Sequence, residues 1–573
     1  MHELYLWPFA DSVKAGVASV MCSYNRVNGT YACENSKTLN GLLKQELGFQ
    51  GYVMSDWTAT MSGVPSMLGG LDMNMPGPLS GPGSIASNPI TSPSLYGGNI
   101  TKAVQNGTVP EWRLDDMVLR VLTPWYYLGQ HLDTYPTMDP SDNVSNAGFG
   151  GANTASSNVT WRTGGPSNRD VRGDHSILIR ELAASAVTLL KNTNGVLPYT
   201  SPPRSIAIFG ADAGDPLGGP DSSSDTSNSG IGTYTGGSTG RQSYLITPLD
   251  AFKQWAYPAR SLLRWQLDDA NIIKNPSLPT YPPTDACFVF INAQSGEGAD
   301  RTSLNFDRNG SALVQAVASV CNNTIVVSHS VGPNIYDFAD NNNVTAILAA
   351  HLPATESGSS LIDVISGKVN PSGKLPYTIP YNSEDSNFAP IANFTGTTNP
   401  DAWVSNFTEG LFIDYRHFDK YNVTPRWEFG YGLSYTTFEI DSIAVTTKSK
   451  PTARPPSTTA ISPGGNSALY ETVAKVTLLV RNTGSVTGAT VAQIYIGFPD
   501  SAPSGTPLRV LRGFRKIKLN PGGIQQVEIP LSRKSLSYWD INVQDWIIPV
   551  GEFKIYAGIS SRDIRQTTNL TLL

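Results

Sequence analysis

The chain has 573 residues, which is too long for one hydrophobic core and predicts roughly three or four domains. Its hydrophobic content of 40% and charged content of 15% are those of an ordinary globular protein. A net charge of −6 without a basic cluster argues against a nucleic-acid partner, and the lack of an apolar run of about 18 residues argues against a membrane span.

Residues 1–130 alternate between helical and extended patterns. Such alternation favours a parallel sheet with right-handed crossovers. The strands expected here are too few for a closed barrel, so we expect the preceding part of the sheet to be missing from this chain. The last helix is expected to end or kink before Pro124. The expected helices cover 3–14, 38–47 and 112–122, and the expected strands cover 17–22, 52–54 and 71–76.

A linker or long surface loop is expected over 131–173, where Ser, Asn, Gly and Thr dominate. A second α/β domain is predicted over 174–390, with a long Gly- and Ser-rich loop after its first strand. Its expected helices cover 177–190, 311–320 and 359–366, and its expected strands cover 205–209, 286–292, 324–328 and 344–349.

A connecting segment and a Pro- and Ser-rich linker are expected over 391–466. After it, short alternating strands separated by turns predict a β-sandwich over 467–573. The fold class is therefore multidomain, with α/β units followed by an all-β domain. The strands expected in the sandwich cover 473–480, 491–498, 526–531 and 552–557.

Frequent glycosylation sequons and a low Lys content favour a secreted glycoprotein. Cys22 and Cys33 flank a turn-rich segment, and Cys287 and Cys321 lie near two predicted strands. We predict the disulfides Cys22–Cys33 and Cys287–Cys321, with four reduced buried thiols as the alternative. No signal-peptide pattern follows Met1, so we expect the signal peptide to be missing as well. The sequons lie at Asn28, Asn99, Asn106, Asn143, Asn158, Asn309, Asn322, Asn343, Asn393, Asn406, Asn422 and Asn569.

The stretch 51–57 is a short apolar run that ends in Ser-Asp-Trp. Such a run predicts a buried parallel strand that delivers the carboxylate of Asp56 to its C-terminal end. Active sites of parallel α/β folds are built at that edge. The alternative is that Asp56 caps the next helix.

A second acid, Glu297, lies in a Ser-Gly-Glu-Gly loop directly after a predicted strand. The flanking glycines allow a ligand to approach closely, and a solvent-exposed turn glutamate is the alternative. Ser238 matches G-x-S-x-G, but its flanks lack the strand and helix that this nucleophile motif needs, so a ligand-covering loop is favoured. The His and Cys residues show no metal-ligand spacing, and 230–232 lacks the features of a dinucleotide or phosphate loop, so neither a metal nor a cofactor is expected.

Several motifs carry a family resemblance. Leu-Trp-Pro-Phe at 6–9, Val-Met-Cys-Ser-Tyr-Asn at 20–25, the stretch 51–57 and Gly-Leu-Asp-Met-Asn-Met-Pro-Gly at 70–77 resemble the last third of the (β/α)8 barrel of glycoside hydrolase family 3, and within it the fungal secreted β-glucosidases. The segments 184–192 and 370–376 resemble the family's α/β sandwich domain, and 410–418 and 429–435 resemble its connection to a fibronectin type III-like domain.

This resemblance implies a retaining β-glucosidase that removes terminal glucosyl residues from cellobiose, cello-oligosaccharides or aryl glucosides. It assigns the nucleophile to Asp56 and the acid/base to Glu297, the two carboxyl groups lying about 5–5.5 Å apart in such enzymes. Their environments should push the two pKa values apart, since one must stay ionised and the other protonated. The residues implied to line the substrate site are Met21, Tyr24, Trp57 and Ser238.

Two alternatives stay open at this point. One is a β-xylosidase of the same family. The other is an inactive or merely carbohydrate-binding fragment, because the first β/α units of the family's barrel, which grip the sugar hydroxyls, are expected to be missing. A β-glucoside or oligosaccharide is the expected substrate, and a homodimer is compatible with the sequence.

Overall fold

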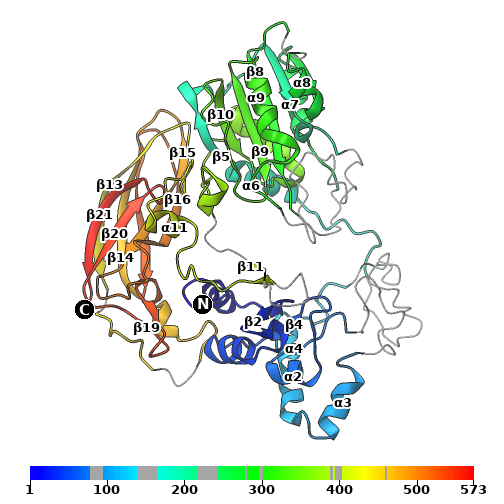
Figure 1. Ribbon diagram of the computed structural model, residues 1–573, viewed down its shortest axis with the longest axis vertical. Coiled ribbons are helices and arrows are strands. Elements are labelled where there is room, and N and C mark those ends of the chain that lie inside the picture. The colour runs from blue at the N-terminus through cyan, green and yellow to red at the C-terminus, as the bar shows by residue number, and fades with distance from the viewer. Residues whose placement is uncertain are drawn as a thin grey trace. The chain divides into compact units, whose positions relative to one another are not determined.

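The computed structural model describes residues 1–77, 94–137, 139, 164–216, 243–277, 281–295, 301–386, 392–393, 403–448, 450–457 and 461–573. The chain forms two compact units, and Figure 1 labels many of their elements. None of the helices in the described ranges combines the length and hydropathy that a bilayer crossing requires. Unit 1 comprises Met1–Val171, Arg454–Glu471 and Trp539–Ile547, and unit 2 comprises Arg172–Ala453, Thr472–Tyr538 and Ile548–Leu573.

Two parallel strands form the centre of unit 1. Strand β1 (Ser19–Cys22) pairs with β4 (Tyr52–Ser55), and Val53 of β4 is completely buried. Val53 belongs to one apolar cluster with side chains of the surrounding helices, as expected for a strand covered on both faces. These helices are α1 (Leu6–Lys14), the π-type helix η2 (Lys37–Glu46), α2 (Val64–Gly69), α3 (Gly98–Gln105) and α4 (Glu111–Tyr127).

A short hairpin follows β1 and is closed by a disulfide. Its strands are β2 (Arg26–Val27) and β3 (Thr30–Tyr31), and Cys22 is bonded to Cys33 just beyond it, with the two Cα atoms 5.2 Å apart. The predicted pairing of these two cysteines is therefore present. The hairpin leaves β1 at its carboxyl end, the same end from which Asp56 follows β4.

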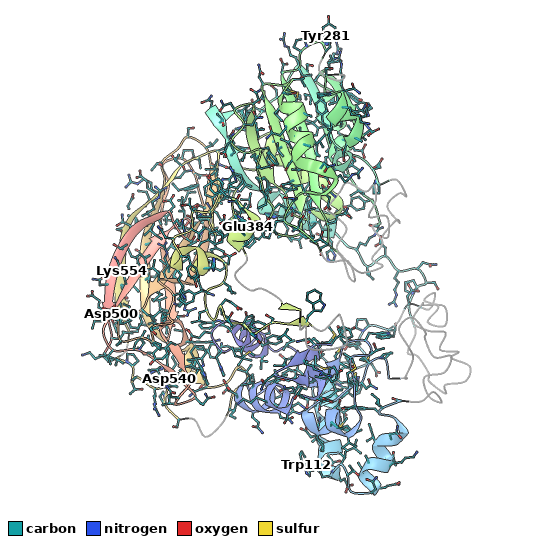
Figure 2. The ribbon with its side chains drawn as sticks, in the orientation of Figure 1. Trp112, Tyr281, Glu384, Asp500, Asp540 and Lys554 are labelled. Atoms are coloured by element: carbon teal, nitrogen blue, oxygen red, sulfur yellow. A yellow bond between two sulfur atoms is a disulfide. The ribbon has the colours of Figure 1, made fainter. Side chains whose placement is uncertain are left out.

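Two predictions for unit 1 need correction. Helix α4 does not end before Pro124 but continues to Tyr127, with the N–H of Leu128 still bonded to the carbonyl of Pro124. A proline in the last helical turn removes one hydrogen bond and leaves the preceding turns intact. The segment 71–76 is not a full strand, because only Met73 forms a parallel bridge, to Met54 of β4. The first turn of α4 carries the exposed Trp112 (Figure 2).

Part of the Pro- and Ser-rich linker predicted within 391–466 is packed in unit 1. The N–H of Gly464 donates to the carbonyl of Leu47 (2.8 Å), and just beyond the linker Nζ of Lys14 lies 4.7 Å from the ring centre of Tyr470. The sequence predicted a linker here, and the backbone hydrogen bond of Gly464 shows that its last part belongs to the first unit.

A six-stranded sheet forms the α/β part of unit 2. Its strand order is β5-β10-β9-β8-β6-β7, and every pair is parallel except β5 with β10. The disulfide Cys287–Cys321, also as predicted, joins β8 to the residue stretch after α9. The strands are β5 (Thr188–Asn192), β6 (Ser205–Phe209), β7 (Leu262–Gln266), β8 (Ala286–Ala293), β9 (Thr324–Ser330) and β10 (Val344–Ala349), and the helices are α6 (His175–Ala186), α7 (Pro248–Ala256), α8 (Asp269–Lys274), α9 (Gly310–Ala318) and α10 (Ser357–Ile365).

The helix predicted over 177–190 is wrong in its last part. Helix α6 ends at Ala186, and Thr188, Leu189 and Leu190 belong to β5, where they are buried against the sheet. An apolar run that includes β-branched residues fits a helix or a buried strand equally well in sequence, and the pairing with β10 decides the outcome.

The all-β part of unit 2 consists of two facing sheets, in the orders β13-β14-β17 and β16-β15-β20-β21, whose inner residues form one apolar core. It confirms the predicted combination of α/β and all-β architecture. Its strands are β13 (Phe438–Thr447), β14 (Thr472–Asn482), β15 (Gly488–Gly497), β16 (Val510–Leu519), β17 (Ile524–Ser532), β20 (Glu552–Gly558) and β21 (Ile564–Thr571), and α11 (Tyr415–Lys420) precedes them.

The sandwich begins earlier than the predicted boundary at residue 467. Strand β13 lies inside the range expected to connect domains, yet it pairs with β14 from Phe438–Asn482 to Thr447–Ala474. Only Phe438 and Ile440 of this strand are buried, so its sequence shows little of the alternation that marks a core strand.

Candidate active site

Asp56 follows β4 directly, at the carboxyl end of the parallel pair. Its backbone N–H donates to the carbonyl of Cys22, the last residue of β1 (3.0 Å). Its side chain is partly exposed, and Oδ1 accepts from the N–H of Trp57 (2.6 Å). Helix α2 begins only at Val64, after Gly63, so the alternative in which Asp56 caps a helix is wrong.

The backbone on both sides of Asp56 is fixed by the segment 73–75. The N–H of Ser55 donates to the carbonyl of Met73 (2.9 Å), and the N–H of Met75 donates to Oγ of Ser55 (2.8 Å). Thr58 donates its N–H to the carbonyl of Met75 (2.9 Å) and has a φ of 67°, an unusual angle for a β-branched residue. Such strain persists only where the surroundings enforce it, and it often occurs at functional sites.

Large side chains lie exposed at the same edge. Met21 is 57% exposed, Tyr24 47% and Trp57 40%. The hydroxyl of Tyr24 donates to the carbonyl of Trp57 (3.0 Å), which links the segment after β1 to the segment after β4. Hydrogen bonds therefore link Tyr24, Trp57 and Asp56, with Asp56 the only carboxylate among them, and Met21 lies one residue before the end of the neighbouring strand β1. Exposed aromatic and thioether groups around an acid are typical of a surface that binds a partly apolar ligand.

A buried cluster of three charged side chains contacts β4 and stabilises it. We call it the Asp72 cluster, and it consists of Lys44, Asp72 and Arg113. Oδ1 of Asp72 accepts from Nζ of Lys44 (2.8 Å) and from Arg113 (2.8 Å), while its Oδ2 accepts from the N–H of Val53 (2.8 Å). All three charged side chains are buried. Burial lowers the pKa of Lys44 to about 8, and the charge of Asp72 opposes that shift.

The Asp72 cluster thus connects two helices to the strand that carries Asp56. Lys44 also donates to the carbonyl of Gly70 (2.7 Å), and Arg113 to that of Met67 (2.8 Å). Sequence reasoning missed this cluster. The available signal was the charge of Lys44 and Arg113 among apolar helix positions, where an unpaired charge would be costly.

Unit 2 has a carboxyl edge of its own, at which strand β8 ends shortly before Glu297 in the sequence. Strand β8 ends at Ala293, and the N–H of Gln294 donates to Oδ2 of Asp307 (2.8 Å). Glu297 and Ser238 lie outside the described residues. Within the described ranges, no group of three or more His, Cys, Asp or Glu residues is arranged to hold a metal ion.

Three polar side chains meet at this edge without having been predicted. Nδ1 of His329 lies 2.6 Å from Oδ2 of Asp212, and Nε2 of His329 lies 3.4 Å from Oγ of Ser357. The residue types are those of a hydrolytic triad. All three side chains are buried, however, so no substrate reaches the hydroxyl. The group instead ties the ends of β6 and β9 to the start of α10.

His351, which lies near His329, predicts that the folded protein loses stability at acid pH. Burial lowers the pKa of His351 to about 4 from an ordinary value of 6.5, and His329 adds to the shift. The unfolded chain binds more protons than the folded chain between these values, so stability should fall as the pH drops from about 6.5 to 4. In calorimetric scans across this range, His351→Gln should show a flatter pH dependence of Tm than the unchanged protein. The exposed His175→Gln is the control, and an unchanged slope for His351→Gln would contradict this prediction.

Comparison with known proteins agrees with this architecture. Residues 1–123 match the glycosyl hydrolase family 3 N-terminal domain, residues 187–435 match the glycosyl hydrolase family 3 C-terminal domain, and residues 490–561 match the fibronectin type III-like domain. Domains of this kind are those of glycoside hydrolases. The chain belongs to glycosyl hydrolase family 3.

Several of its relatives are fungal proteins. The chain is 50% identical to the probable beta-glucosidase G of Aspergillus flavus over all of this chain and 69% of that protein. It is 44% identical to the probable beta-glucosidase L of Aspergillus fumigatus over 99% of this chain and 72% of that protein. Among solved structures, the beta-D-glucoside glucohydrolase of Trichoderma reesei is 40% identical with a TM-score of 0.84, and the match covers all of this chain and 75% of that one.

Proposed function

We propose that the chain is a β-glucosidase that hydrolyses terminal non-reducing β-D-glucosyl residues with retention of the anomeric configuration. The position of Asp56 carries this proposal: it is a partly exposed carboxylate at the carboxyl end of a parallel strand, beside the exposed ring of Trp57. The names of the relatives, which are beta-glucosidases, support the substrate class. In this proposal Met21, Tyr24, Trp57 and Ser238 line the sugar site.

The proposed reaction has two displacements. The carboxylate of Asp56 attacks C1 of the glucosyl residue, and the bond from C1 to the leaving oxygen breaks while Glu297 donates a proton to that oxygen. A water molecule then gives its proton to Glu297 and attacks C1, which releases glucose and restores the Asp56 carboxylate. The ordered backbone around Asp56 holds the nucleophile in place, which lowers the entropy cost of the first step.

The acid/base role of Glu297 can be tested by comparing substrates with different leaving groups. Glu297→Ala should slow hydrolysis by about 10²–10⁴-fold for alkyl glucosides, because their leaving oxygen needs a proton. The loss should be much smaller for a dinitrophenyl glucoside in the glycosylation step, since its leaving group departs unprotonated. Added azide should restore turnover of the dinitrophenyl substrate and give the β-glucosyl azide. An equal loss for both substrates would contradict the assignment.

The substrate class is tested with the natively expressed protein. Rates on nitrophenyl β-glucoside and nitrophenyl β-xyloside should be measured side by side, and proton NMR should identify the anomer released first. The proposal expects the glucoside to be preferred and β-glucose to appear before mutarotation. A preference for the xyloside would identify a β-xylosidase, and α-glucose as the first product would contradict retention.

We also propose that the protein is secreted and N-glycosylated. The two disulfides support an oxidising compartment, and sequons such as Asn28 and Asn422 fall on turns where a glycan has room. The domain limits proposed are a barrel part over 1–130, an α/β sandwich domain over 174–390 and a β-domain that, given β13, starts near residue 438.

A further inference from the structure

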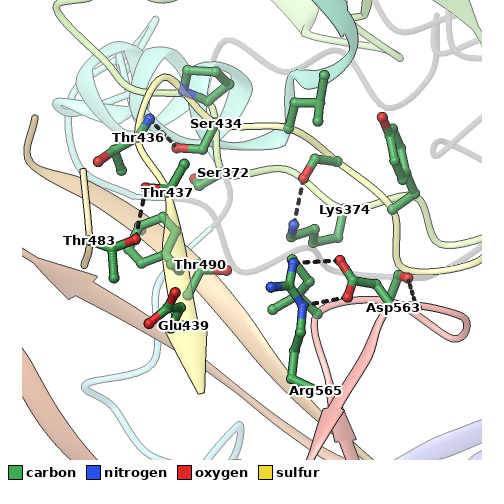
Figure 3. A pocket seen from close by; sticks show the side chains of 18 residues that line it. Ser372, Lys374, Ser434, Thr436, Thr437, Glu439, Thr483, Thr490, Asp563 and Arg565 are labelled. Atoms are coloured by element: carbon green, nitrogen blue, oxygen red, sulfur yellow. Dashed lines mark hydrogen bonds and ion pairs between the residues drawn. The ribbon is translucent and has the colours of Figure 1, made fainter. Parts of the chain in front are cut away.

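A cavity of about 520 Å³, lined by both polar and apolar side chains, lies within unit 2, and we call it the seam cavity (Figure 3). Its volume is in the range of sites that hold small molecules. Its walls come from the segment 371–374 after α10, the segment 431–439 that leads into β13, the start of β15, and the turn 559–565 between β20 and β21. The proposed chemistry at Asp56 belongs to unit 1 and uses none of these residues.

Two largely buried residues present hydroxyl groups to the seam cavity. Ser372 is 6% exposed and Thr490 is 3% exposed. Neither hydroxyl is bonded to another residue in the described part of the chain, and both oxygens stay accessible from the cavity, since neither is among the enclosed polar atoms that lack a partner. Water or a ligand that carries hydroxyl groups can therefore bond to both of them.

A partly buried ammonium group, that of Lys374, offers further donors to the same space. Nζ of Lys374 donates to the carbonyl of Gly432 (2.6 Å), and a lysine ammonium has three donors in all. Burial lowers the pKa of Lys374 to about 8, which reflects the missing solvation of this charge. A ligand oxygen placed beside Nζ would replace part of that solvation.

The charges on the wall exclude a strongly charged ligand. Lys374 and Arg565 supply the positive charges, and Glu439 and Asp563 supply the negative ones. Arg565 and Asp563 form an ion pair, as Figure 3 shows. With the two signs balanced, neither an anion nor a cation gains net attraction. A neutral ligand that both donates and accepts hydrogen bonds fits this wall.

We propose that the seam cavity binds a small neutral saccharide, of one or two sugar rings, through Ser372, Thr490 and Lys374. A sugar hydroxyl accepts from a lysine ammonium, donates to a carboxylate such as Asp563, and pairs with a serine or threonine hydroxyl. The rings of Tyr431 and Phe438 also line the cavity and offer apolar surface to the C–H groups of the sugar.

Hydrogen–deuterium exchange during titration with glucose tests this site. Glucose should protect the peptides covering 431–439 and 559–565 in a saturable manner. Thr490→Val replaces the hydroxyl with a methyl group of similar size and should weaken the apparent affinity by about tenfold, the value of one hydrogen bond. Thr477→Val is the matched control, because it makes the same change on β14 outside the cavity and should leave the affinity unchanged.

Each outcome has a clear meaning. Absence of saturable protection, or equal affinity for the chain with Thr490→Val, would show that the cavity holds only water and would overturn the proposal. Protection by sulfate as strong as that by glucose would overturn the charge argument. Protection in an Asp56→Asn variant should equal that in the unchanged protein. The test of the seam cavity is therefore independent of the test of Asp56. Either proposal can fail without affecting the result for the other.

Discussion

Replacing Asp56 with glycine should lower kcat on nitrophenyl β-glucoside by about 10⁴-fold or more, as the loss of a covalent nucleophile does. The glycine removes the carboxylate that forms the bond to C1, and water cannot attack from the same face with comparable positioning. Steady-state rates of the purified variant measure the loss. Circular dichroism and the exchange of the β4 peptide should be unchanged, since in the described part of the chain the Asp56 side chain accepts only the N–H of the next residue.

Azide should rescue Asp56→Gly in a diagnostic way. It would occupy the space of the missing carboxylate, attack C1 directly and yield the α-glucosyl azide, whose configuration is inverted. Asp56→Asn is the control, because its amide fills that space and should prevent rescue. A variant that keeps more than a tenth of the original kcat, or a rescued product of β configuration, would contradict a nucleophilic Asp56.

The second large effect is expected at Asp72. Asp72→Asn should lower the free energy of opening of β4 by about 3–5 kcal/mol, because it leaves the buried cations Lys44 and Arg113 without their counter-charge. Native-state hydrogen exchange measures this directly. The amide of Val53, which donates to Oδ2 of Asp72, should exchange more than about 100-fold faster.

A matched carboxylate provides the control for Asp72. Asp116 contacts the same Arg113 at 2.8 Å, but its side chain is one-third exposed. Asp116→Asn should therefore cost less than about 1 kcal/mol, since solvent screens an exposed ion pair. If the two variants open β4 equally easily, the Asp72 cluster does not stabilise the strand. Because β4 leads directly into Asp56, we expect Asp72→Asn to lower kcat as well.

The sequence predicts best those strands that are apolar on both faces. Strands β6, β8, β9 and β10 were all found within a few residues, since burial on both sides leaves a continuous run of Val, Ile, Ala and Phe. Strand β7 was missed because it lies at the edge of the sheet and keeps a half-exposed pattern. Strand β16 was missed because arginine and lysine cover its exposed face.

The site was predictable only in part. Asp56 could be placed at a strand end because the apolar run stops directly before it. The partners of Asp72 could not be found, since Lys44 and Arg113 lie 28 and 41 residues away along the chain and meet it only in the folded core. The seam cavity was also invisible in the sequence, because Ser372 and Thr490 belong to segments that fold from separate parts of the chain.

Trapping of the glycosyl intermediate tests the central claim most directly. The natively expressed protein should be treated with a 2-deoxy-2-fluoro-β-glucoside that carries an activated leaving group, then digested and mapped by tandem mass spectrometry. The account predicts time-dependent inactivation with one fluoroglucosyl group esterified to Asp56. A label on another carboxylate, or inactivation without any covalent label, would contradict it.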